Sequence, residues 1–256
     1  MQFSHRISEL CTEFAIPADK SREREYTLEG WKIRQADHPC GRYHTLSAGN
    51  ILTLSAEERA RLVRAAATLL AGYLEDAACV LVCGLGNGDL AADRLGVSTC
   101  RRLSLTGSLP GGRTMYAFCP GVPAATGLPT DTLVAMTAEC IHADRILAVD
   151  ALCARSAASL SSVLQYTDTG LTPGSGSSTD PAGTKPHGTE FPPEISTRTM
   201  PCPVVTAGVP TVIRTTLPEG GNTHYLVTTG EVDRTVDSWS SVLAAAILRA
   251  MLSCGK

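Results

Sequence analysis

The sequence predicts an α/β protein with a doubly wound, mainly parallel sheet and helices on both faces. Apolar runs of strand length alternate along the chain with amphipathic stretches of helix length, which is the order of strand–helix–strand units. The clearest run, Cys79 to Cys83, is followed directly by the glycine-rich turn Gly84 to Asn87. At 256 residues without a central linker, the chain is expected to form a single domain over residues 1–256.

The expected elements follow in order. Residues 23–53 read as short strands, with Arg42 to Leu46 the strongest candidate. Ser55 followed by Glu58 is a capping-box pattern that opens a helix to about residue 75. Thr130 or Asp131 is expected to cap a later helix. The other expected elements are strands at 78–83, 114–119, 145–149 and 204–209, helices at 90–102, 131–142 and 232–251, and a helix or turn at 156–164.

Two of these helices show an apolar face at helical spacing, which predicts that each packs on the sheet. The buried face is expected to hold Leu62, Ala65, Ala66, Leu69 and Leu70 in the first helix, and Trp239, Val242, Leu243, Ala246 and Ile247 in the last.

Two segments lack such patterns. Residues 1–22 are polar and mixed, and they are expected to be extended or poorly ordered. Residues 170–202 are rich in Gly, Ser, Thr and Pro and hold few large apolar side chains, so they are expected to form a flexible loop.

Composition excludes several classes of protein. A net charge of −3 gives no electrostatic reason to expect nucleic-acid or membrane binding. No apolar run reaches the roughly 18 residues of a membrane span. The first residues lack the apolar segment of a secretory signal, so a cytoplasmic location is expected. The ten cysteines show no C-x-x-C spacing, which favours reduced, mostly buried thiols over a metal site.

Two aspartates stand where a sheet of this type binds ligands. Asp93 follows the run 79–83 and its turn, and Asp150 follows the run 146–149. Ligands of open α/β sheets bind beyond the carboxyl ends of the strands. Two carboxylates facing one crevice can share a proton, as an acid–base pair requires. Both positions also suit helix caps, and Asp93 also suits an ion pair with Arg94, so position alone leaves these interpretations open.

Five stretches then occur in a fixed order: GLGN with DRLG, PGVPAATG, LAVDALCARS, DTGLTPGSG and AGVPTV. This series resembles the spore germination protease family, and GRYHTLSA at residues 41–48 is a weaker match. The resemblance implies an endopeptidase that degrades small acid-soluble spore proteins. It also implies a fold type shared with hydrogenase maturation peptidases, the phosphorylase/hydrolase-like arrangement.

The resemblance assigns roles to individual residues. Asp150 matches the aspartate of the family's I-D-A-L-A-A-R-S segment, and Asp93 aligns with the other essential aspartate, in P-D-A-L-G; both are expected to be catalytic. Here Ala92 replaces the proline and Arg94 an alanine, and an adjacent arginine is expected to lower the pKa of Asp93. Four further residues are expected to bind or orient the substrate: Asn87, Arg155, Ser156 and Asp168.

The family also implies a zymogen, so residues 1–22 are a propeptide-like candidate, and a homo-oligomer in the forespore or spore core, with no cofactor and no metal. Thr172 stands where the family has a histidine, and the chain stops soon after AGVPTV and one further helix, as a short member would. A non-catalytic paralogue with a binding or regulatory role is therefore the alternative. A weaker alternative is a metal-sensing maturation peptidase, with His142 completing an acid–acid–histidine site.

Overall fold

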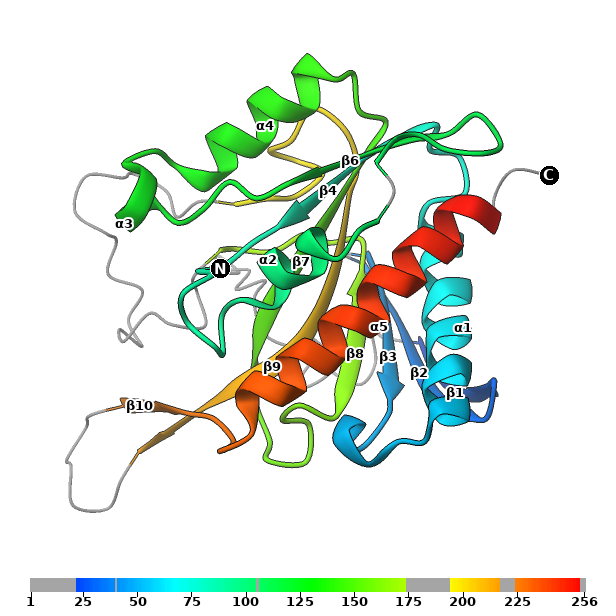
Figure 1. The fold of residues 1–256 in the computed structure, drawn as a ribbon, viewed down its shortest axis with the longest axis vertical. Helices are drawn as coiled ribbons and strands as arrows, with labels where there is room; N and C mark the ends of the chain where they lie inside the picture. The colour runs from blue at the N-terminus through cyan, green and yellow to red at the C-terminus, as the bar shows by residue number, and fades with distance from the viewer. Residues whose placement is uncertain (1–21, 40, 105, 174–193, 217–223, 254–256) are drawn as a thin grey trace.

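A computed structural model describes residues 22–39, 41–104, 106–173, 194–216 and 224–253 of the chain (Figure 1). Within these ranges, ten strands form one sheet in the order β1-β2-β3-β8-β9-β7-β4-β6-β5, and β10 pairs with β9. The strands are β1 Arg22–Leu28, β2 Trp31–His38, β3 Gly41–Ser47, β4 Cys79–Gly84, β5 Gly107–Ser108, β6 Thr114–Phe118, β7 Arg145–Ala154, β8 Val163–Thr167, β9 Val204–Thr216 and β10 His224–Val227.

The sheet is mixed. Its centre, β9-β7-β4-β6, is parallel, and the remaining pairings are antiparallel. The predicted α/β class is confirmed, whereas the parallel part is confined to these four strands. At the β1–β2 edge of the sheet, a local turn accounts for the antiparallel pairing. Glu29 and Gly30 form this two-residue turn, and both of their φ angles are positive, 51° and 84°. Such a turn joins neighbouring antiparallel strands.

Helices cover both faces of the sheet (Figure 1). On one face, α1 packs beside α5, and α2 packs against α5 and β4. On the other face, α4 packs over β4 and β7 through a separate apolar cluster that includes Val134 and Ala138. The helices are η2 Ile51–Thr53, α1 Ala56–Tyr73, α2 Leu95–Arg101, α3 Pro123–Thr126, α4 Thr130–Cys140 and α5 Val232–Ser253.

The strongest local predictions are confirmed. The Ser55 hydroxyl accepts from the Glu58 N–H at 3.2 Å, and the Glu58 carboxylate accepts from the Ser55 N–H at 2.8 Å, which is a complete capping box. The ten apolar side chains expected on the inner faces of α1 and α5 are all buried. Helix type and packing face were therefore readable from apolar spacing.

Three boundaries differ from expectation. The helix expected at 90–102 is only α2, because residues 88–93 form turns. Neither Thr130 nor Asp131 caps α4: Pro129 precedes its first turn, and no side chain caps it. The strand expected at 145–149 continues to Ala154, because β9 extends past residue 209 and pairs along its length.

The candidate flexible loop at 170–202 is described only at its ends, and residues 174–193 and 1–21 lie outside the described part of the chain. Leu171 and Ile195 form an isolated β-bridge, and their side chains are 2% and 0% exposed. These two residues join the apolar cluster beneath α4. Both ends are thus packed, which the polar composition did not predict.

Candidate active site

The loop after β4 folds back on itself through a glycine. Gly86 has φ of +97°, and a Cβ built on it would lie 1.9 Å from the Asp93 carbonyl oxygen. Only a residue without a side chain allows both that backbone angle and that approach. The start of the loop is fixed to the sheet by the Leu85 N–H, which donates to the Val149 carbonyl at 2.9 Å. The turn therefore brings Asp93 back toward the end of β4.

Asp93 is oriented by the loop backbone. Its Oδ2 accepts a hydrogen bond from the Asn87 N–H at 2.7 Å. Partial burial raises the pKa of the Asp93 carboxyl, and the Asn87 N–H opposes that rise by favouring the ionised form. Asp93 does not cap α2, whose N-cap is Arg94.

Asp150 lies within β7, at the level where the neighbouring strand β4 ends. Val149 is the partner of Gly84, the last residue of β4. Asp150 is 8% exposed. Burial, and then the negative charge of Asp93, raise the pKa of Asp150 to about 8, while the Ala151 N–H donates to Oδ1 at 2.8 Å and opposes the rise. The two predicted catalytic aspartates are therefore close enough to interact electrostatically.

Arg94 does not act on Asp93. Its guanidinium pairs with Asp233 at 3.0 Å and with Asp237 at 3.6 Å, both on α5. The expectation that Arg94 lowers the pKa of Asp93 is wrong, since burial raises that pKa and Arg94 is not among its causes. The helix that follows Asp93 turns the arginine toward α5.

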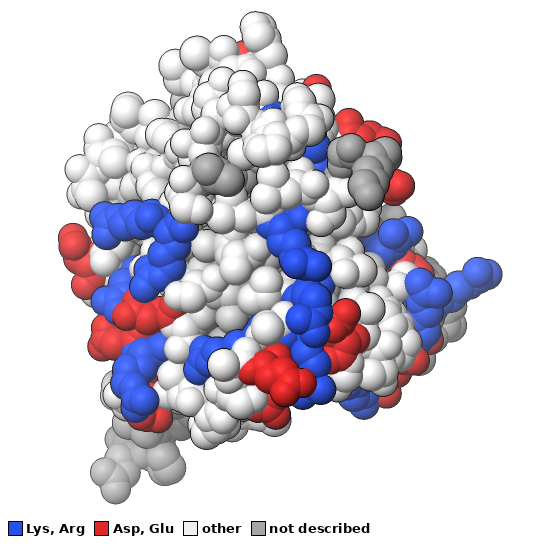
Figure 2. All heavy atoms as spheres, turned by 45° about the vertical axis from the view of Figure 1, so that its right-hand side comes forward, with Lys and Arg blue, Asp and Glu red and all other residues white. Residues whose placement is uncertain are grey.

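On the face shown in Figure 2, basic and acidic side chains are interspersed and form no patch of a single sign.

The predicted orienting residue Asn87 contacts one member of the acid pair, Asp93, but it does so with its backbone N–H and not with its side chain. Its side-chain oxygen accepts from the Asp89 N–H at 2.9 Å and closes a local turn. The backbone N–H is the group that contacts Asp93. The glycine-rich sequence predicted a tight turn here. It did not indicate whether the backbone or the side chain of Asn87 would contact the acid pair.

Arg155 and Ser156 lie farther from Asp150 in space than expected. Because β7 continues to Ala154, Arg155 follows five residues after Asp150, roughly 16 Å along an extended strand. The Ser156 hydroxyl lies 2.9 Å from that of Ser159 in the turn before β8. The structure does not bring these two residues to the acid pair.

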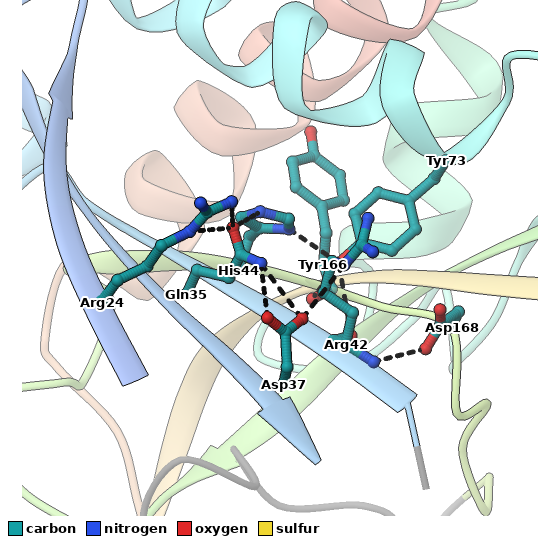
Figure 3. Close-up of polar contacts among 8 residues, drawn as sticks. All are labelled: Arg24, Gln35, Asp37, Arg42, His44, Tyr73, Tyr166 and Asp168. Atoms are coloured by element: carbon teal, nitrogen blue, oxygen red, sulfur yellow. Dashed lines mark hydrogen bonds and ion pairs between the residues drawn. The ribbon is translucent and has the colours of Figure 1, made fainter. Parts of the chain in front are cut away.

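Asp168 comes directly after Thr167, which register places level with Ala148 of β7, so it lies two strands away from Asp150 and nearer the amino end of β7. It follows β8, which runs antiparallel to β9, and it points at the start of β3, where its Oδ1 accepts from the Arg42 N–H at 2.7 Å (Figure 3). A Cβ on Gly41 would come within 2.2 Å of that same oxygen. This contact joins β3 to the end of β8 and accounts for Asp168 structurally.

The surroundings of Asp168 include a polar cluster that the sequence did not reveal. His44 Nδ1 lies 2.8 Å from the Tyr73 hydroxyl, and His44 Nε2 lies 3.1 Å from Gln35 Oε1 (Figure 3). Burial lowers the pKa of His44 to about 4, so the ring is neutral at physiological pH. The cluster joins α1 to the antiparallel edge of the sheet, and alternation of apolar and polar residues in β3 gave no sign of it.

Mostly buried thiols were expected, and of the seven described cysteines three are buried, two are half-buried and two are exposed. Cys83 and Cys100 are buried, whereas Cys119 and Cys140 are exposed. A hydrogen bond with Cys100 lowers the pKa of Cys119 to about 7.

In the described ranges, no group of three His, Cys, Asp or Glu residues is arranged to hold a metal ion.

A family model described as germination protease matches residues 23–249. The chain belongs to the germination protease family. It is 32% identical to the germination protease of Bacillus subtilis (strain 168) over 209 residues, covering 76% of this chain and 53% of that protein. It is 33% identical to that of Bacillus pumilus (strain SAFR-032) over 207 residues, covering 75% and 52%. The chain thus spans about half the length of these relatives.

The family resemblance read from the ordered motifs is confirmed by these matches. A solved structure, the [NiFe] hydrogenase maturation protease HycI from Thermococcus kodakarensis KOD1, aligns with a TM-score of 0.41 at 14% identity, over 70% of this chain and 98% of that one. None of the helices in the described ranges is both long and apolar enough to cross a membrane.

Proposed function

We propose that this chain is an endopeptidase of the aspartic type, with Asp93 and Asp150 as its catalytic acids. The observation that carries the proposal is their electrostatic coupling: the Asp93 charge raises the pKa of a buried Asp150 carboxyl, while a backbone N–H holds Asp93. Two carboxyl groups whose environments separate their affinities for the proton are the pattern of an acid–base pair.

The environments suggest a division of roles. Asp150, with a pKa of about 8, is protonated at neutral pH and donates a hydrogen bond to the scissile carbonyl, then a proton to the leaving amine. Asp93, whose ionised form is favoured by the Asn87 N–H, takes a proton from the attacking water. The water oxygen bonds to the carbonyl carbon, and collapse of the tetrahedral intermediate breaks the C–N bond. The acid pair itself supplies every proton transfer in this scheme.

The proposed substrates are small acid-soluble spore proteins, degraded within the spore during germination. Membership of the germination protease family supports this choice. An unfolded, flexible protein chain suits the site, because Asp150 is buried within a strand and an extended chain is the narrowest form of a polypeptide substrate. The family's oligomeric assembly and propeptide are proposed for this chain on the same ground.

Incubation of the chain with a purified small acid-soluble spore protein tests the proposal. Discrete fragments are expected from the wild type and none from Asp93→Asn or Asp150→Asn. Asp89→Asn is the matched control, because Asp89 is an exposed aspartate in the same loop. Cleavage by either acid variant, or loss of cleavage on adding EDTA, would contradict the aspartic assignment. Absence of cleavage by the wild type would favour the non-catalytic paralogue.

A further inference from the structure

Three polar groups on the sheet face that carries Asp150 are buried without a hydrogen-bond partner. They are the hydroxyls of Thr45 and Thr206 and the side-chain amide nitrogen of Gln165. The three residues are 4% to 6% exposed. Buried polar groups almost always have partners, so an orphaned set on one surface needs an explanation. A ligand that supplies the missing partners is one.

Strand register places these groups beside the candidate active site. Thr45 is directly opposite Gln165, Gln165 is opposite Gly208, and Gly208 is the partner of Asp150. These four residues form a row across β3, β8, β9 and β7, and partners in register project to the same face. Thr206 belongs to the next row, two residues before Gly208 in β9. The orphaned groups therefore continue from Asp150 across the sheet.

The row is buried, but the apolar cluster beneath α4 does not extend over it. The apolar cluster beneath α4 includes residues of β4, β7 and β9 but, among the described residues, none of β3 or β8. Leu152 and Val163 pack against each other on the same face. The Leu152 side chain also lies over Gly208, since a Cβ on Gly208 would come within 2.6 Å of it, so a substrate that joins Asp150 to Gln165 passes over Leu152. Asp150 is as buried as the orphaned groups, so a substrate that reaches the acid pair enters at the same depth.

The chemistry of the row matches a polypeptide backbone. An amide N–H₂ donates to carbonyl oxygens, and threonine hydroxyls both donate and accept, which suits alternating peptide C=O and N–H groups. Between Asp150 and Thr45 the row contains no further carboxylate, lysine or arginine, which favours main-chain recognition there, and beyond Thr45 it continues to Arg34 of β2. Strands lie about 4.8 Å apart, so Gln165 is about 10 Å from Asp150, the length of about three extended residues.

We propose that Gln165, assisted by Thr45 and Thr206, is a positioning residue that binds the substrate main chain about three residues from the scissile bond. The proposal rests on the proposed protease function, because it takes Asp150 as the point of cleavage. It adds the direction of the substrate: across the strands from β7 toward β3.

The test replaces Gln165 with Leu, which keeps most of the volume and removes the amide. With a small acid-soluble spore protein as the substrate, KM is expected to rise about 3- to 10-fold, the effect of one lost hydrogen bond, while kcat changes less than about 2-fold. In the non-cleaving Asp93→Asn background, the Kd for the fluorescently labelled spore protein is expected to rise by the same factor. Thr206→Val, an isosteric change, is expected to weaken binding in the same direction.

Tyr166→Phe is the matched control. Its hydroxyl is also buried without a partner, and it lies on the same strand but faces α1 and α5. Its loss is expected to leave KM and Kd unchanged. The thermal midpoint of Gln165→Leu is expected not to fall, because no internal bond of that amide nitrogen is broken.

An unchanged Kd in both Gln165→Leu and Thr206→Val, or equal weakening by Tyr166→Phe, would overturn the inference while leaving the protease function intact. Absence of cleavage by the wild type, with binding that still depends on Gln165, would instead overturn the function and keep the peptide site.

Discussion

Arg94 pairs with Asp233 of α5 at 3.0 Å and leaves the adjacent Asp93 to the backbone of its own loop. Two adjacent residues thus differ in role: Asp93 is a catalytic candidate, whereas Arg94 forms a structural ion pair. Their side chains point apart because Arg94 is the N-cap of α2 and Asp93 belongs to the preceding loop. The positive charge of Arg94 is directed at α5, and the environment of Asp93 is set by burial and the Asn87 N–H.

Arg94→Gln should therefore have little effect on the acid pair. The acid limb of the pH–rate profile, which reports Asp93, is expected to stay in place. The free energy of unfolding is expected to fall by less than about 1 kcal/mol, since the paired Asp233 is largely exposed. Cleavage assays between pH 4 and 9, together with urea denaturation, measure both quantities. A clear upward shift of the acid limb would show that Arg94 does act on Asp93.

Asp150→Asn should stabilise the protein at alkaline pH while abolishing cleavage. The pKa of Asp150 is raised in the folded state, so the folded protein binds more protons than the unfolded chain between about pH 4 and 8, and stability falls as pH rises through that window. Asparagine removes this loss. The gain at pH 8 is expected to be about 1–4 kcal/mol, and it should shrink toward zero near pH 4. Denaturant unfolding at both pH values measures it, and a wild type whose stability rises from pH 5 to 8 through Asp150 would contradict the account.

Gly86→Ala should distort the site. The substitution places a Cβ against the Asp93 carbonyl at a φ of +97°, and it is expected to cost about 2–4 kcal/mol of stability and most of the activity. Gly88→Ala is the control from the same loop: its nearest neighbour would be the Val97 side chain at 3.4 Å, an ordinary contact. Thermal unfolding and cleavage rates compare the two variants. Equal effects would mean that the loop is not held as described.

Cys119 should be the most reactive of the described thiols. Its pKa of about 7 makes it largely thiolate at pH 8, and it is exposed, whereas burial raises the pKa of Cys83 strongly. Iodoacetamide at pH 8, followed by peptide mass spectrometry, is expected to modify Cys119 well before Cys83. Cys100→Ala removes the hydrogen bond that lowers the Cys119 pKa and is expected to slow its alkylation. Preferential labelling of Cys83 would contradict the described packing.

Much of the fold was predictable because short-range rules decide it. The capping box at Ser55 and the apolar faces of α1 and α5 need only spacing and local hydrogen bonds, and they appear as expected. The extension of β7 beyond Val149 depends on pairing with β9, more than fifty residues away in the sequence, which no local pattern reveals. The short α2 has a different explanation, since residues 88–93 form turns where the sequence predicted the start of the helix.

The acid pair was predictable for a different reason. In the sequence, Asp93 and Asp150 each follow an apolar run, and β4 ends beside Val149 of its parallel neighbour β7, which brings the two positions together. Asp168 was expected to bind or orient the substrate; the structure gives it a contact with the Arg42 N–H, and its role toward a substrate stays a prediction. Gln165 had no signal at all: a glutamine between apolar strand residues is unremarkable until its register with Gly208 and Asp150 is known.

The coupling of the two acids is the central claim, and a carboxyl-carbon NMR titration of Asp150 tests it most directly. In the wild type, Asp150 is expected to titrate near pH 8. In Asp93→Asn the neighbouring negative charge is absent, so the pKa of Asp150 is expected to fall, though it should stay above its ordinary value because burial persists. A wild-type Asp150 that titrates at the ordinary value near 3.9, or one whose pKa does not move in Asp93→Asn, would contradict the account.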